Sequence, residues 1–202
     1  MARSQVEKAE THRRIVEVAS RRFRERGLDG IGVADVMKEA GLTVGGFYKH
    51  FASRDELVRE ALGEAYGVWS ARLAEAESAG RCVTFTDIAG DYLSERHREG
   101  VGGGCPFAAL APDIARCDEK TRGEATAELE RSIEVLTDVR GGEGDGASRR
   151  KAAIVAYATL VGAMTLARIP EGGTLGEEIL SAARETLLEP DGKAEGRGSP
   201  SA

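Results

Sequence analysis

Three consecutive polar side chains, Tyr48, Lys49 and His50, bring a hydroxyl, an ammonium and an imidazole together in one short segment. Phe47 and Phe51 flank these groups four residues apart, so on a helix both aromatic rings face the same side. With the rings turned inward, the hydroxyl, ammonium and imidazole are left on the outer side. Donors of this kind bind the phosphates of nucleic acids.

Two short helices are predicted to position these donors. The apolar residues of the first recur at i, i+3, i+4 and i+7, which is the spacing of one helical face: Val33, Val36, Met37 and Ala40. Gly41 ends this helix because glycine takes the left-handed backbone conformation at little cost. Thr43 is a suitable N-cap for a second helix over 44–51.

The second helix has the layout of a recognition helix in the major groove. Its first residues are small, so its N-terminal end can lie near base edges. The predicted DNA contacts are Thr43, Val44, Gly45, Gly46, Tyr48, Lys49 and His50. No Arg, Asn or Gln is present to make bidentate base contacts, so DNA shape and thymine methyl contacts with Val44 are expected to contribute. The alternatives are a packing role for Tyr48 and a helix-end cation at His50.

Residues 32–57 resemble the DNA-binding domain of the TetR family of transcriptional repressors. The resemblance rests on the AG turn, the YxHF end of the recognition helix and the SRDEL start of the next helix. The matching residues are Val36, Ala40, Gly41, Thr43, Gly46, Tyr48, His50, Phe51, Ser53, Glu56 and Leu57. The family usually carries Thr or Ser just before the first of these helices. Here Ile31 and Gly32 stand there, which removes one expected phosphate contact.

Charge is distributed unevenly along the chain. The net charge is −6, which by itself argues against a nucleic-acid partner. Residues 1–54, however, carry 11 Lys and Arg against 7 Asp and Glu, a net of +4, and the remainder carries −10. A basic head on an acidic body fits DNA contact at one end, although chance asymmetry gives the same pattern.

Apolar periodicity predicts an all-α fold of about nine helices, with a three-helix head and a larger helical bundle. The predicted helices beyond the motif cover 6–26, 54–80, 84–98, a segment from Pro106, 118–138, 148–168 and 175–188. The corresponding domains are a helix-turn-helix domain over 1–53 and an effector-sensing and dimerisation domain over 54–188. Residues 189–202, rich in Gly, Ser and charge, are predicted to be a disordered tail.

The last two helices are predicted to form a homodimer interface. Residues 152–167 are apolar almost all round, and such a helix needs cover on every side. A second copy would cover the face carrying Ala156, Thr159, Gly162 and Ala163 and give a two-fold interface built from 148–168 and 175–188. The alternative is the central helix of a monomeric bundle. At 16 residues the run is short for a membrane span.

Cys105 is a candidate sensor. It follows the glycine-rich segment 100–104 and precedes Pro106, which suits the first position of a helix. The positive end of a helix dipole favours the reactive thiolate at such an N-cap. The segment GCPFAAL resembles that of a TetR-family subgroup that includes electrophile- and oxidant-sensing repressors. A small, buried, inert cysteine is the alternative.

An effector pocket is predicted in the body because aromatic residues lie on helices that must converge. The candidate ligand and sensor residues are Cys105, Trp69, Phe85, Tyr92, Phe107 and Tyr157. The same residues would also build a solid core. The resemblance implies that a small apolar or electrophilic effector in this region releases double-stranded operator DNA.

Other function classes find little support. No GxSxG, HExxH, P-loop or dinucleotide fingerprint occurs, and the histidines His12, His50 and His97 form no metal or triad pattern, so no enzyme, metal or cofactor is predicted. Three unpaired cysteines and the absence of a signal peptide point to the cytoplasm. A homodimeric repressor is the preferred interpretation. The alternative is a helical small-molecule-binding or thiol-sensing protein without DNA binding.

Overall fold

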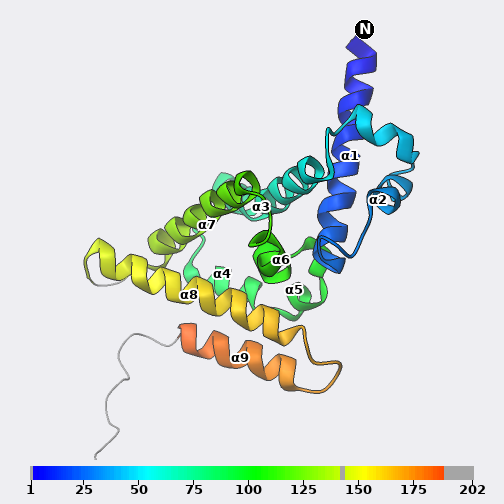
Figure 1. Ribbon diagram of the computed structural model, residues 1–202. Helices are drawn as coiled ribbons and strands as arrows, with labels where there is room; N and C mark the ends of the chain where they lie inside the picture. The colour runs from blue at the N-terminus through cyan, green and yellow to red at the C-terminus, as the bar shows by residue number, and fades with distance from the viewer. Residues whose placement is uncertain (1, 142–143, 189–202) are drawn as a thin grey trace, which may run out of the picture.

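A computed structural model describes residues 2–141 and 144–188, which form nine α-helices, two 3-10 helices and no strand. Figure 1 shows α1 and α2 grouped at one end of the molecule, with the body of helices spread beside α1. The head contains α1 (Ala2–Arg26), α2 (Val33–Glu39) and η1 (Val44–Lys49). The all-α prediction is confirmed. The predicted tail, 189–202, lies outside the described residues.

The body follows a long connecting helix. Its elements are α3 (Arg54–Ser78), α4 (Phe85–Tyr92), α5 (Glu95–Glu99), η2 (Val101–Gly103), α6 (Pro106–Ile114), α7 (Glu119–Arg140), α8 (Gly146–Ala167) and α9 (Leu175–Leu188). In Figure 1, α8 and α9 run alongside each other at the edge of the body farthest from the head.

Two glycines fix the geometry of the head. Gly27 ends α1 with φ +78°, and Gly41 ends α2 with φ +73°, a region that L side chains rarely adopt. After Gly41 the backbone N–H of Leu42 donates to the carbonyl of Met37 at 2.8 Å, which closes the end of α2. The chain is thereby turned into η1, as the AG pattern predicts.

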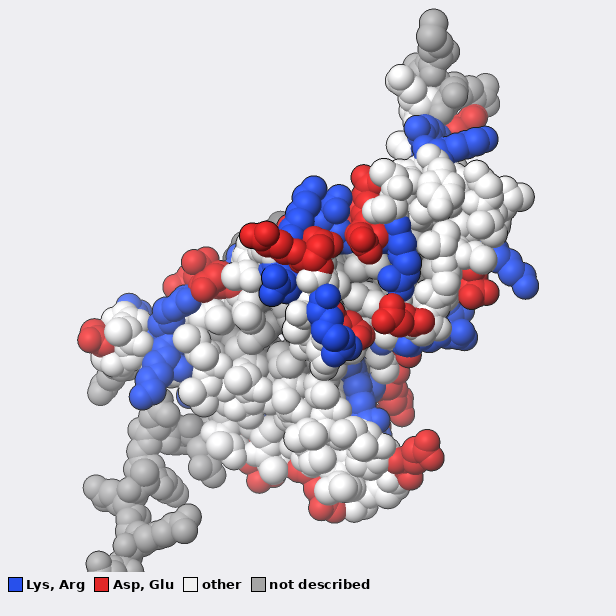
Figure 2. Space-filling model, in the orientation of Figure 1, with Lys and Arg blue, Asp and Glu red and all other residues white. Residues whose placement is uncertain are grey.

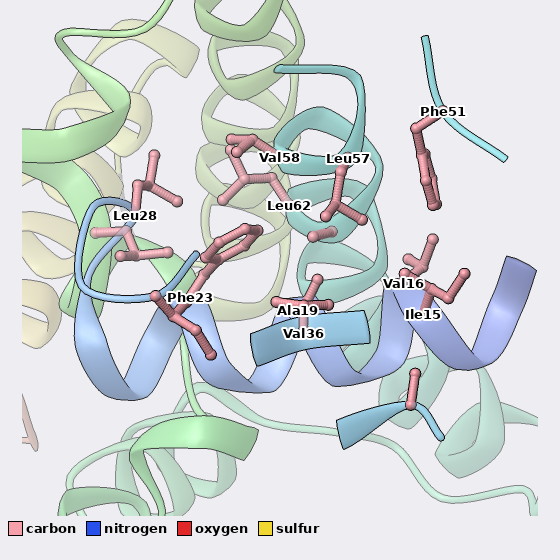
Figure 3. Packing of buried hydrophobic residues seen from close by; sticks show 14 of the residues in the cluster. Ile15, Val16, Ala19, Phe23, Leu28, Val36, Phe51, Leu57, Val58 and Leu62 are labelled. Atoms are coloured by element: carbon pink, nitrogen blue, oxygen red, sulfur yellow. The ribbon is translucent and has the colours of Figure 1, made fainter. Parts of the chain in front are cut away.

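Apolar side chains from α1, α2, η1 and α3 build one core under the head. Ile15, Ala19, Val36 and Leu57 are fully buried, and Phe51 is 1% exposed. Figure 3 shows Phe23, Leu57 and Leu62 reaching toward one another from α1 and α3, and Phe51 above Ile15 and Val16. Burial of this kind is the main favourable term in folding, so the core holds η1 against α1.

Two hydrogen bonds cap the start of α3. The N–H of Glu56 donates to Ser53 Oγ at 3.1 Å, which makes Ser53 the N-cap of α3. The Glu56 carboxylate accepts the N–H of Ala52, one residue earlier than a standard capping box would place it.

The head and the body share contacts through α6 and η2. Leu110 and Ile114 of α6 belong to the same apolar cluster as the head. Arg24 of α1 is buried and its Nε donates to the carbonyl of Gly102 in η2 at 2.8 Å. At the end of α6, Asp113 accepts the N–H of Leu28 at 3.4 Å. A movement of α6 would therefore be felt by α1 directly.

The predicted single helix over 84–98 is wrong, because Ser94 starts a new helix. Its hydroxyl accepts the N–H of His97 at 3.2 Å and donates to the carbonyl of Asp91. The result is α4, with a capping box at Thr84, and a separate α5. Pro112 lies inside α6, which continues to Ile114 before it ends.

Candidate nucleic-acid interface and ligand cavity

The predicted α-helix over 44–51 is a 3-10 helix over Val44–Lys49. Two adjacent glycines at its start disfavour the α-helix, since glycine loses the most backbone entropy when it is ordered. The N–H of Gly46 donates to the carbonyl of Thr43 at 3.0 Å. Thr43 itself is extended and its hydroxyl makes no cap, so the predicted hydroxyl cap is wrong.

The aromatic residues divide between the core and the surface as predicted. Phe47 is 2% exposed and stacks on Phe51 with ring centroids 5.4 Å apart. Tyr48 is 78% exposed and Val44 is 51% exposed. An exposed tyrosine between two buried phenylalanines is placed for a partner and adds little to the core.

Backbone accessibility differs between the two glycines of η1. A Cβ atom added to Gly45 would meet no atom within 4 Å, so this backbone faces open space. The corresponding atom on Gly46 would lie 3.6 Å from Met37 Cε, so Gly46 backs onto α2. The surface offered by η1 is therefore Val44, Gly45 and Tyr48, with Thr43 and Lys49 exposed at its two ends.

His50 is half-buried at the end of η1, and its Nδ1 has no hydrogen-bond partner among the described residues. Burial, followed by the charges of His12, Lys8 and Lys49, holds the pKa of His50 below its usual 6.5. The unbound ring is therefore neutral near pH 7, which disfavours the helix-end cation. The neighbouring His12 bonds through Nε2 to Glu60 at 2.5 Å, with its ring centroid 5.9 Å from that of His50.

Several arginines of α1 are paired within the head. Arg22 Nε lies 2.7 Å from a Glu39 carboxylate oxygen, and Arg21 bonds to the other oxygen. The hydrogen bond from Arg22 lowers the pKa of Glu39. Arg24 faces η2 in the body and not the solvent. These arginines make contacts within the fold. Lys8 and Lys49, whose charges act on His50, make no ion pair within the described chain.

At the start of α2 the family's usual hydroxyl is missing. Gly32 occupies the N-cap with φ −87° and ψ 160° and makes no side-chain bond. Ile31 is 5% exposed and packs in the core of the head. The head therefore holds α2 by apolar burial where the family pattern has a capping hydroxyl.

A cavity of about 100 Å³ opens in the body between α3, α4, α6, α7 and α8. Its lining residues are Ala65, Tyr66, Ile88, Tyr92, Cys105, Pro106, Phe107, Glu128, Arg131, Ser132, Val135, Leu136, Tyr157 and Leu160. Four predicted residues meet there: Tyr92, Cys105, Phe107 and Tyr157. Phe85 does not line the cavity and lies in the body core with Arg140 4.9 Å over its ring. The Trp69 side chain lies outside the described part of the chain.

The sequence prediction missed Tyr66 on α3 and three polar residues of α7, namely Glu128, Arg131 and Ser132. The three share one helical face at i, i+3 and i+4, and this spacing was available as a signal. Glu128 and Arg131 form an ion pair at 2.8 Å, and burial raises the pKa of Glu128. They supply the cavity's charged rim.

Aromatic rings form the wall of the cavity. Tyr66 stacks on Phe107 with centroids 5.3 Å apart, and Phe107 meets the ring of Tyr157 edge-on at 6.3 Å. The buried Tyr66 hydroxyl has no partner among the described residues. Burial raises the pKa values of Tyr66, Tyr92 and Tyr157, so all three phenols stay neutral. The cavity thus offers neutral donors in apolar surroundings.

Cys105 is the N-cap of α6 as predicted, but it is only 4% exposed. Its N–H donates to His97 Nε2 at 2.9 Å, while His97 Nδ1 lies 2.7 Å from the carbonyl of Tyr92. A carbonyl only accepts and an amide N–H only donates, so His97 is the neutral ring protonated at Nδ1. A Cβ on Gly104 would lie 2.7 Å from the His97 ring. The glycine-rich segment is thus a packed turn that contains η2.

Only part of the predicted face of α8 is exposed, since Thr159 and Gly162 are half-buried while the two alanines lie in the core. Ala156 is fully buried and Ala163 is 8% exposed, because both pack in the body core. The exposed apolar side chains of α8 are Ile154, Val155 and Leu166, and Ile169 and Leu175 extend the face toward α9. Figure 2 shows few charges on the surface over α8 and α9.

By length and composition α8 alone among the described helices is apolar enough to cross a membrane, and 28% of its most apolar window is buried. Core helices of soluble proteins pass the same test, so no span is assigned. Within residues 2–141 and 144–188, no group of three His, Cys, Asp or Glu side chains is arranged to hold a metal ion.

The head, together with the start of α3, is similar in sequence to known regulatory proteins. Residues 15–61 match the family described as bacterial regulatory proteins, tetR family. The HTH-type transcriptional regulator TtgR of Pseudomonas putida is 36% identical over 77 residues, which is 37% of this chain and 37% of TtgR. The chain thus aligns with little more than a third of that relative's length.

Solved structures extend the likeness to the whole fold. Reduced NemR of E. coli superposes with a TM-score of 0.72 at 22% identity, over 89% of this chain and 95% of NemR. AibR, solved with isovaleryl coenzyme A and operator DNA, gives 0.62 at 15% identity, over 89% and 99%. Residues 15–61 are therefore similar to the tetR family of bacterial regulatory proteins, and the chain as a whole has the fold of solved structures such as NemR.

Proposed function

We propose that the protein is a cytoplasmic transcriptional repressor that binds operator DNA as a homodimer and is released by a small apolar or electrophilic effector. The observation that carries the proposal is the exposed surface of η1. Val44 and Tyr48 are exposed to solvent, while Phe47 on the same short helix and Phe51 just after it are buried. On the second helix of this motif, an exposed valine suits contact with base edges, and an exposed tyrosine hydroxyl suits a phosphate.

The homodimer is proposed from the apolar face of α8 and α9. Ile154, Val155 and Leu166 are each more than 40% exposed in the single chain. A second copy related by two-fold symmetry would cover this face with itself. Two heads would then reach two half-sites, which a single small head binds too weakly to select.

The effector site is proposed to be the cavity behind Phe107. AibR, a protein of the same fold, is solved with both a ligand and operator DNA. In this chain the cavity touches Cys105, Pro106 and Phe107, which begin α6, and the end of α6 meets the head at Leu28. A ligand that displaces α6 would therefore shift α1 and the spacing of the heads.

Reaction at Cys105 is the finer form of this proposal. Its thiol lines the cavity and is otherwise buried, so an electrophile would have to enter the cavity to reach it. Addition of the thiolate to an activated carbon–carbon double bond forms a carbon–sulfur bond, breaks the π bond and leaves the thiol proton on the neighbouring carbon, and the added group would occupy the cavity. Cys105→Ser keeps the N-cap and removes the reaction. Release of DNA by an electrophile in the wild type alone would support a thiol switch.

The uncapped start of α2 favours a second candidate, a helical small-molecule-binding or thiol-sensing protein without DNA binding. Gly32 supplies no hydroxyl to a phosphate, and the positive excess of the head is modest. Relatives in the comparison carry the names of transcriptional regulators, which favours the repressor and argues against an enzyme.

Footprinting on DNA upstream of the protein's own reading frame tests the proposal. The repressor should protect two half-sites whose centres lie about 10 base pairs, or a multiple of that, apart. Tyr48→Ala should abolish the footprint without unfolding the chain. Absence of any protected site in this DNA and in a library of other promoters would favour the second candidate.

A further inference from the structure

A hollow lies where the second and third turns of α1 face the end of η1. Its walls are Glu7, Lys8 and Thr11 on one side and Lys49 and His50 on the other. In Figure 2, a small blue group of Lys or Arg side chains, with acidic atoms beside it, lies near the protruding end of α1 and next to a surface with few charges. The hollow thus joins the protruding end of α1 to the proposed recognition helix.

The charges in the hollow favour an anion. Lys8 and Lys49 are exposed and make no ion pair among the described residues, whereas Glu7 contributes one negative charge to the same wall as Lys8. The Thr11 hydroxyl already donates to the carbonyl of Glu7 at 2.8 Å, so it forms wall and adds no donor. The two ammonium groups are left as the available donors.

His50 completes the site. Its neighbours are Lys8 and His12 from α1, Lys49 from η1, and Glu60 of α3, which is engaged by His12. The Nδ1 atom is buried without an acceptor, and another edge of the ring lines the hollow. An anion in the hollow would attract the protonated ring and offset the repulsion from the two lysines, which favours the charged form of His50.

Resting on the proposed function, we propose that this hollow holds one backbone phosphate of the operator duplex between Lys8 and Lys49, and that His50 takes up a proton from solvent as the phosphate enters. The second and third turns of α1 then belong to the DNA interface together with η1. Operator binding becomes linked to proton uptake. Because the complex holds more protons than the free protein, affinity rises as pH falls toward the range where free His50 titrates.

The phosphate contact is tested by the salt dependence of binding. Anisotropy of a labelled upstream duplex is measured with the full chain, comparing wild type, Lys8→Gln and the matched control Lys120→Gln at the exposed start of α7. The plot of log K against log salt has a negative slope, and each lost phosphate contact makes this slope shallower by about 0.9. For Lys8→Gln this corresponds to about an eightfold loss of affinity per head at about 0.1 M salt. Glu7→Gln is expected to tighten binding.

The proton is tested by repeating the titration between about pH 6 and about pH 8.5 at constant ionic strength. Wild type should gain affinity with a slope approaching one proton per head, and His50→Gln should flatten the profile while His12→Gln retains it. Specific binding by wild type with identical salt slopes for Lys8→Gln and Lys120→Gln would overturn the phosphate site and leave the repressor standing. A pH slope that persists in His50→Gln would overturn the proton linkage. Failure of wild type to bind any duplex would overturn the inference together with the proposed function.

Discussion

Tyr48 and Phe51 are close in sequence, but their replacement by alanine is predicted to have different effects: Tyr48→Ala should weaken DNA binding, and Phe51→Ala should destabilise the fold. Phe51 is 1% exposed and its ring stacks on Phe47 at 5.4 Å and on His12 at 4.5 Å. Removing a buried phenylalanine ring costs about 3–5 kcal/mol, including the cavity left behind. Tyr48 is 78% exposed and has one edge contact with Phe47 at 5.2 Å, so its loss should cost about 0.5 kcal/mol or less.

The assay is urea unfolding followed by circular dichroism, with DNA binding measured on the same preparations. Tyr48→Ala should unfold like wild type and lose operator affinity. Phe51→Ala should lower the free energy of unfolding by several kcal/mol, a large part of a typical stability of about 5–15 kcal/mol. Phe51→Leu, which keeps most of the volume, should cost less and retain DNA binding. If Tyr48→Ala proved as destabilising as Phe51→Ala, the division of η1 into a buried and a contacting face would be wrong.

Three further predictions concern the body. Asp118 caps α7, and hydrogen bonds from Thr121 lower the pKa of Asp118 below its usual 3.8. The ionised cap therefore stabilises the folded protein above pH 3.8, and this stabilisation is lost as the pH falls through the pKa of Asp118 in the folded state. Asp118→Asn should therefore lower Tm near neutral pH, with a difference that narrows in acid. Tyr66→Phe removes an unpartnered buried hydroxyl, so it should preserve or raise the stability of the protein. It should also weaken the binding of neutral phenols or ketones measured by calorimetry, and an unchanged affinity would exclude Tyr66 as the hydrogen-bond donor to the ligand. Val155→Glu should convert a dimer to a monomer in light scattering and weaken operator binding about as much as loss of one half-site. Arg149→Glu, a charge change on another side of the same helix, should affect assembly less, and a dimer that tolerates Val155→Glu would place the interface elsewhere.

The sequence was a good guide where local physics decides the outcome. Gly41 ends α2 with a positive φ, Ser53 caps α3 and Pro106 opens α6 after Cys105. Each of these is set by a single residue and its immediate neighbours, so a pattern in the chain is enough. The burial of Phe47 and Phe51 followed from helical spacing alone.

Predictions failed where a tertiary contact or a weak local preference determined the structure. Thr43 has the right chemistry for a cap, yet η1 winds as a 3-10 helix and leaves the hydroxyl unused. The face of α8 was misjudged because small residues such as Ala156 suit both a core and an interface, and only the packing of α7 and α9 shows which they join. Tyr66 lines the cavity and Lys8 lines the hollow beside residues that are distant in sequence, and no local pattern in the chain predicts such contacts.

The central claim is that η1 reads DNA. The most direct measurement is the anisotropy of a labelled duplex from the upstream region, titrated with wild type and Tyr48→Ala across a range of salt, beside a scrambled duplex of equal length and composition. Wild type should prefer the upstream duplex at least about a thousandfold, with affinity that falls steeply as salt rises, and Tyr48→Ala should lose that preference. Equal, weak binding of both duplexes by both proteins, extended over other promoters, would contradict the account.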